Sequence, residues 1–178
     1  MKISANSVLG GKTTIGETSM PITKAGDTSG ATTTFTATTV VDATAWDLSA
    51  VAAGMYAVTS DGYVGLISVV NDGTDTVTVK AWVKMSNGIV GTPTATSTVT
   101  VHKVYQCTQM VIVADTSNGS TIHVQRNGDD ATTNDYVLNA DERLVIKPVV
   151  GSKYVNVTKI NGISASGNLV LWFMTDAE

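Results

Sequence analysis

Tight-turn dipeptides recur along most of this chain, and they limit its fold more than any other feature of the sequence. The Asn-Gly and Asp-Gly pairs are Asp61-Gly62, Asp72-Gly73, Asn87-Gly88, Asn118-Gly119, Asn127-Gly128 and Asn161-Gly162. Asn, Asp and Gly tolerate the positive φ that hairpin turns require. Between the pairs lie runs rich in Val, Ile and Thr, whose side chains fit the pleated surface of a sheet. Since charged residues make up only 15% of the chain, we predict an all-β fold of short antiparallel strands.

The same pattern divides the chain into three segments. Residues 1–30 mix Gly, Ser, Thr and Lys with isolated apolar residues at neither helical nor strand spacing. We therefore predict an extended N-terminal arm there, ordered only against a partner. Residues 31–103 and 104–178 each carry strand and turn signals, which predicts two small antiparallel β-sandwich or barrel domains. The arm residues that we expect to contact a partner are Ile3, Val8, Leu9, Ile15, Met20 and Ile22.

Charge and hydropathy argue against two classes of partner. The formal net charge is −4, and only two arginines, Arg126 and Arg143, stand among the eleven basic residues. Nucleic-acid binding without sequence preference needs a basic stripe, so we predict no nucleic-acid partner. No apolar run approaches the roughly 18 residues of a membrane span. The first residues also lack the charged segment followed by an apolar segment that is typical of a secretory signal. We expect no membrane partner and synthesis in a host cytoplasm.

Two short motifs resemble catalytic signatures but depart from them. GGKTT (10–14) resembles the end of a phosphate-binding loop, but Asn6 stands where that loop needs its first glycine. GISASG (162–167) resembles a nucleophile elbow, but Ser166 stands where the elbow needs a glycine. Cys107 with His102 or His123 is a conceivable nucleophilic pair, although a lone cysteine is more often a buried apolar group. We predict no catalytic residue, no cofactor and no enzymatic activity.

Metal binding has similarly weak support. One cysteine and two histidines supply at most three of the four ligands of a structural zinc site. The acidic runs NDGTD (71–75) and NGDDATTND (127–135) could offer oxygen ligands to calcium, but neither has the spacing of a helical-hand loop. We interpret both runs as solvated turns and predict no metal site.

Aromatic residues in the first domain raise the alternative of sugar binding. Over residues 76–83 apolar and polar side chains alternate, and Trp82 falls on the polar phase with Lys80. We therefore expect Trp82 at the surface or at an interface, with Tyr63 as a second candidate surface ring. Trp46 and Tyr56 flank an apolar stretch, which favours a place in the core.

Two stretches resemble a known class of proteins. They are DLSAVAAGMYAVTSDGYVGLISVVNDGTDTVTVKAW (47–82) and MVIVADTSNGSTIHVQRNGDDATTNDYVLNADERLVIKP (110–148). Together with the arm and the low charge, they are similar to accessory virion proteins of tailed bacteriophages, especially head decoration (cement) proteins and short head fibres. The resemblance implies a soluble subunit on the particle surface, commonly a homotrimer, and it supplies no catalytic residue.

The predicted function follows from the resemblance and the arm. We expect a non-enzymatic virion structural protein, a capsid decoration or stabilising subunit that binds the major capsid protein through its N-terminal arm. One alternative places the chain in the tail as a fibre, tube or adaptor component. Another is a carbohydrate-binding module or adhesin that uses Trp82 and Tyr63.

Overall fold

The computed structural model describes residues 8–26, 28–30, 33–42, 44 and 46–175 of the 178-residue chain. This described part contains strands and two three-residue 3-10 helices, η1 (Asp72–Thr74) and η2 (Val157–Lys159), but no α-helix. The all-β prediction is confirmed. The chain forms two compact units: a terminal unit, Met1–Thr23 with Val104–Glu178, and a central unit, Lys24–Lys103.

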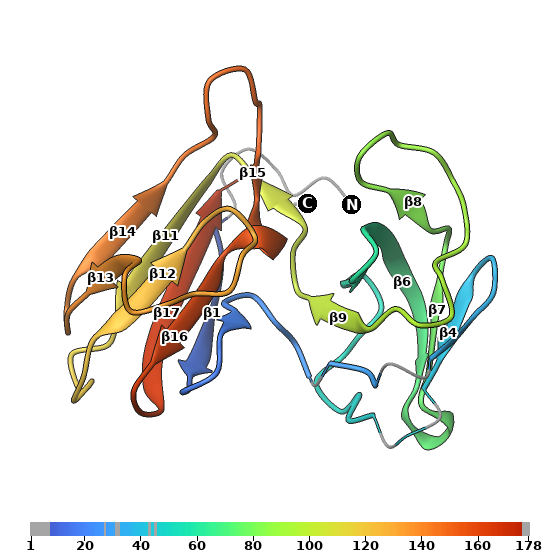
Figure 1. The fold of residues 1–178 in the computed structure, drawn as a ribbon, viewed down its shortest axis with the longest axis horizontal. Helices are drawn as coiled ribbons and strands as arrows, with labels where there is room; N and C mark the ends of the chain where they lie inside the picture. Colours follow the sequence, from blue (N-terminus) through green and yellow to red (C-terminus); the bar gives the residue numbers. More distant parts are fainter. Residues whose placement is uncertain (1–7, 27, 31–32, 43, 45, 176–178) are drawn as a thin grey trace. The chain divides into compact units, whose positions relative to one another are not determined.

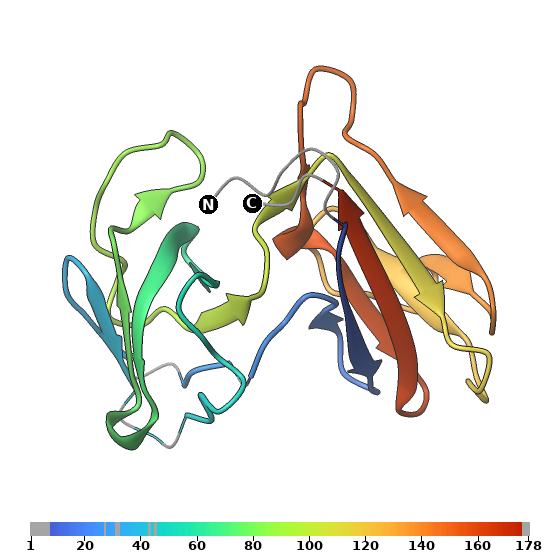
Figure 2. The same cartoon turned by 180° about the vertical axis from the view of Figure 1, so that it is seen from behind.

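The terminal unit is a sandwich of two four-stranded antiparallel sheets (Figures 1 and 2). The first sheet has the order β1 (Val8–Ile15), β17 (Asn168–Thr175), β11 (Gln109–Ala114) and β14 (Arg143–Ile146). The second has the order β13 (Tyr136–Leu138), β12 (Ile122–Gln125), β16 (Asn161–Ser164) and β2 (Met20–Pro21). Two short strands, β10 (Gln106–Cys107) and β15 (Val155–Asn156), pair separately.

Alternating side chains of these two sheets form the core of the terminal unit. Trp172 and Val170 of β17, Ile112 of β11, and Ile122 and Val124 of β12 are almost fully buried together. This is the two-residue period that a strand presents to a core on one of its faces.

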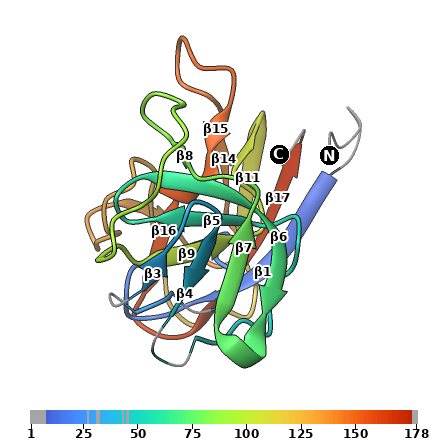
Figure 3. The same cartoon turned by 90° about the vertical axis from the view of Figure 1, so that its right-hand side faces the viewer.

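The central unit is built on one antiparallel sheet, which faces the viewer in Figure 3. Its order is β3 (Thr34–Phe35), β4 (Thr39–Val41), β7 (Thr76–Val79), β6 (Tyr63–Asn71), β5 (Tyr56–Thr59) and β9 (Val99–His102), with β8 (Val83–Lys84) also on β6. The register of β6 against β7 shifts between Ile67 and Val69, and such a bulge bends a strand. The curved sheet surrounds a separate core that contains Trp46 and Trp82.

The leading residues belong to these units, and the prediction of a separate arm over residues 1–30 is wrong for the described residues among them. β1 pairs with β17 along its whole length, from Val8 opposite Thr175 to Ile15 opposite Asn168. Farther along, the Ala25 N–H donates to the Val101 carbonyl of the central unit at 2.7 Å. The physical reason is that β11 pairs with only one edge of β17, and β1 supplies the hydrogen-bond partners that the opposite edge needs.

Candidate functional site

The residues predicted to anchor a partner lie in the terminal unit rather than on an arm. Ile15 and Ile22 are fully buried in its core, and Met20 packs against that core. Val8 and Leu9 lie in β1, opposite Thr175 and Met174, while Ile3 lies outside the described residues. Ile15 and Ile22 are therefore buried inside this chain and cannot contact a partner.

The two candidate surface aromatics are not brought together as an exposed platform. Trp82 is fully buried and meets Phe35 edge-on, with ring centroids 5.6 Å apart, so the expectation of an exposed Trp82 is wrong. The strand β7 ends at Val79, and the alternation that placed Trp82 on the polar phase does not continue past that point. Tyr63 is half-buried, and Lys84 Nζ lies 4.5 Å from the centroid of its ring.

The cysteine and the two histidines fall in different environments. His102 belongs to the central unit, whereas Cys107 and His123 belong to the terminal unit. Cys107 is fully buried in β10, and burial raises the pKa of its thiol to about 12. The thiolate needed for nucleophilic chemistry is therefore strongly disfavoured. His123 is half-buried in β12, and its Nε2 lies 3.3 Å from Thr121 Oγ1.

The acidic runs form hydrogen-bonded turns. Asp72 Oδ1 accepts from the Leu48 N–H at 3.0 Å, which ties η1 to the loop that precedes β5. In the second run Asp135 accepts from Gln125 Nε2 and from the Thr132 N–H, both at 2.7 Å. Within the described residues, no group of three or more His, Cys, Asp or Glu side chains is arranged to hold a metal ion.

A surface that sequence reasoning missed lies on the outer side of the first sheet. In β17 the side chains of Val170, Trp172 and Met174 point to the core, so the outward positions fall to Leu169, Leu171 and Phe173. These outward positions are apolar as well. We call the outward apolar side chains of this sheet the apolar face: Val111, Val113, Val145, Leu169, Leu171 and Phe173.

The strand register makes the apolar face continuous across three strands. Phe173 lies opposite Val111, and Val111 lies opposite Val145 on the other side, so these three side chains form one row. Phe173 and Val145 remain about two-fifths exposed, at 40% and 41%. In β1, Gly10 pairs with Phe173, and its missing side chain leaves room for the phenyl ring, since a Cβ there would lie 3.0 Å from Phe173 Cδ1.

Polar side chains and a shallow cavity border the apolar face. Lys12 on β1 and Arg143 on β14 are exposed at the two edges of the apolar face. Across the strands they lie in one row with Leu171 and Val113. A cavity of about 290 Å³ opens beside Phe173, next to Gln109 and Thr175. The sequence signal for this surface was present: Leu169–Met174 is an uninterrupted apolar run, which is typical of a strand covered on both faces.

Comparison with known proteins gives no relative for this arrangement. The described part of the chain holds no helix with the length and apolar character needed to span a bilayer. No protein-family model, no curated protein and no solved structure matches the chain.

Proposed function

We propose that the chain is a structural protein of a tailed-bacteriophage particle, a capsid decoration or stabilising subunit whose partner is the major capsid protein. The observation that carries the proposal is the apolar face, which six side chains on three strands form at the surface of the terminal unit. Contiguous exposed apolar patches with a polar border are typical of protein–protein contacts.

The geometry changes the expected means of attachment. Because Ile15 and Ile22 are buried in the terminal unit, we assign the contact with the shell to the apolar face and not to the leading segment. A sheet whose strands are apolar on both sides is usually covered on both sides. A neighbouring subunit that covers the apolar face would remove Phe173, Leu171 and Val145 from water. Many identical contacts on one particle act together, so each can be modest.

Cosedimentation tests this proposal. The purified chain is mixed with empty shells assembled from the major capsid protein of the same genome, and we expect it to sediment with them. The variant Leu171→Thr/Phe173→Thr places β-branched residues, which favour strands, at both positions of β17 and should lower the bound fraction at least tenfold. The control Val41→Thr/Val69→Thr makes the same kind of change at exposed strand positions of the central unit and should bind like wild type.

Two results would overturn the proposal. One is a wild-type chain that stays in the supernatant with shells, and the other is equal binding by the apolar-face variant and its control. Sedimentation with isolated tails instead of shells would replace the head assignment by the tail alternative. Thermal unfolding of each variant checks that it is folded, and light scattering measures whether the free subunit is the homotrimer that the resemblance implies.

A further inference from the structure

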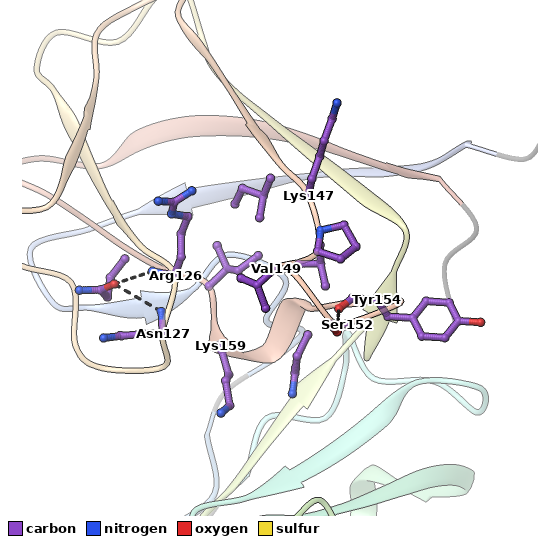
Figure 4. Close-up of a pocket in the computed structure, with 13 residues that line it drawn as sticks. Arg126, Asn127, Lys147, Val149, Ser152, Tyr154 and Lys159 are labelled. Atoms are coloured by element: carbon purple, nitrogen blue, oxygen red, sulfur yellow. Dashed lines mark hydrogen bonds between the residues drawn. The ribbon is translucent and has the colours of Figure 1, made fainter.

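A cleft of about 450 Å³ lies at one end of the terminal unit (Figure 4). The turn Gln125–Asn127 borders it on one side, and the long loop between β14 and β15 borders it on the other. Its apolar wall is formed by Ile146, Val155 and Ile160, which are almost fully buried. The volume falls within the range of pockets that bind a small ligand or a short peptide segment.

The cleft is cationic in a chain that is acidic overall. Its lining includes Arg126, Lys147 and Lys159 and, among the residues that the structure describes there, no carboxylate. Among the described residues, no side chain forms an ion pair with any of these three. Figure 4 shows that they come from three segments and that Lys147 and Lys159 extend in opposite directions. This spread suits an occupant with several separated carboxylates better than a single small anion.

Hydrogen bonds hold the cleft in shape. Gln125 Oε1 accepts from the N–H of Arg126 at 2.7 Å and from the N–H of Asn127 at 3.3 Å, and both bonds are drawn as dashed lines in Figure 4. The stem of Lys159 lies against Gly128, where a Cβ would be 3.3 Å from Lys159 Cγ. The nearby Asp129 carboxylate accepts from Asn127 Nδ2 at 2.7 Å. The site is therefore formed before any ligand arrives.

The central unit carries a segment of opposite character. The hairpin of β6 and β7 turns through η1, and residues 68–79 contain two carboxylates, Asp72 and Asp75, and no cationic residue. Asp72, Gly73 and Thr74 at the tip are exposed, and Gly73 keeps the tip narrow. Beside it Val69 is 56% exposed. The hairpin thus combines separated negative charges with an apolar side chain, as the occupant of the cleft should.

We propose that the cleft of one copy binds the β6–β7 hairpin tip of a second copy. The carboxylates of Asp72 and Asp75 lie against the cationic border, and Val69 contacts Val149, which lines the cleft and is 76% exposed. Since the two surfaces differ, each contact is head-to-tail, and its repetition closes into a ring of two or more copies or extends into a filament. Surface ion pairs are individually weak and are screened by salt, so the association is expected to be modest and salt-sensitive. The inference does not depend on the proposed virion function.

Sedimentation equilibrium of the full chain at about 0.05 M and about 0.5 M NaCl tests the contact. At low salt the average mass should rise with protein concentration, and at high salt it should fall toward the single-chain mass of 18.5 kDa. Association through the apolar face cannot mimic this result, because salt does not weaken the burial of apolar side chains. A monomer at both salt concentrations would overturn the proposal.

Paired variants locate the contact. Lys147→Gln/Lys159→Gln removes two cations from the cleft, and Asp72→Asn/Asp75→Asn removes both hairpin charges while keeping an oxygen acceptor for the Leu48 N–H. Each variant alone should associate at least tenfold more weakly at low salt. The controls Lys12→Gln/Lys80→Gln and Glu17→Gln/Asp141→Asn make matched charge changes at other exposed positions and should associate like wild type.

Mixing the two variants gives the decisive result. The cleft variant still has an intact hairpin, and the hairpin variant still has an intact cleft, so the mixture should form a dimer of one copy of each that does not grow further. This result requires the cleft of one copy to contact the hairpin of another. A mixture that stays monomeric, or controls that dissociate as much as the variants, would refute it.

Discussion

At the scale of single residues, the burial of His102 has a consequence for stability. His102 is 1% exposed in β9, and burial, with a smaller contribution from the charge of Lys24, lowers its pKa from 6.5 to about 3. Between these two values the unfolded chain binds a proton that the folded chain does not. The free energy of unfolding therefore falls as the pH falls through this window, by about 1.4 kcal/mol per pH unit from this residue alone.

Urea unfolding of the central unit, followed by its amide NMR signals between pH 7.5 and pH 4.5, measures this dependence. The variant His102→Gln should lose about 1.4 kcal/mol less per pH unit than wild type below pH 6.5. His123→Gln leaves His102 in place and should keep the wild-type slope. Equal slopes for the wild type and His102→Gln would show that burial of this imidazole does not set the pH dependence.

Other single residues show which environments can be predicted from sequence. Trp46 was expected inside because it flanks an apolar stretch, and Cys107 because a lone cysteine is more often a buried apolar group. Both are buried. Trp82 was assigned to the surface from its phase in an eight-residue alternation, but the strand ends three residues earlier. Alternation predicts orientation only as far as the strand extends, and the sequence gives strand ends poorly.

At the scale of elements, local signals predicted the strands whose partners follow nearby. The strand β12 lies between two of the predicted turns, Asn118-Gly119 and Asn127-Gly128, because turn residues are local signals. The strand β1 gave no such signal: it contains two glycines and pairs with β17, which is about 150 residues away in sequence. Its pairing is determined by the free edge of β17, which local sequence patterns do not report. The apolar face was missed for a related reason. A continuous apolar run is typical of a strand that is buried on both faces, so it does not indicate that one face lies at the surface.

The contact between β1 and β17 predicts the effect of one added methyl group. A Cβ at Gly11 would lie 2.4 Å from Cζ2 of Trp172, whose ring is fully buried. Gly11→Ala must displace either the ring or the strand, so we expect a loss of about 1–3 kcal/mol in the stability of the terminal unit. Gly119→Ala is the control because a Cβ there meets nothing within 4 Å, and its effect should stay within about 0.5 kcal/mol. Urea unfolding followed by NMR of the terminal unit compares them, and equal stabilities would contradict the close contact.

At the scale of the whole molecule, the chain leaves the terminal unit after Thr23 and returns to it at Val104. The register of β1 on β17 places Val8 opposite Thr175, so the beginning of the first strand and the end of the last are neighbours. Residues 104–175 joined through a Gly-Ser linker of about four residues to residues 8–23 should therefore form an ordinary hairpin at the junction. We expect this rearranged chain to fold alone, with dispersed amide NMR signals and a buried Trp172.

Residues 104–178 without the leading segment are the comparison for that chain. They lack β1 and β2, and they also lack Ile15 and Ile22, two fully buried members of the core. Removing a large buried aliphatic side chain costs about 2–5 kcal/mol, so losing both, together with a complete row of strand hydrogen bonds, should exceed the stability of a domain this small. We expect narrow amide dispersion and no cooperative unfolding transition. A stable fold of residues 104–178 alone would mean that the leading segment only covers a finished sandwich, which would make its release toward a partner physically reasonable again.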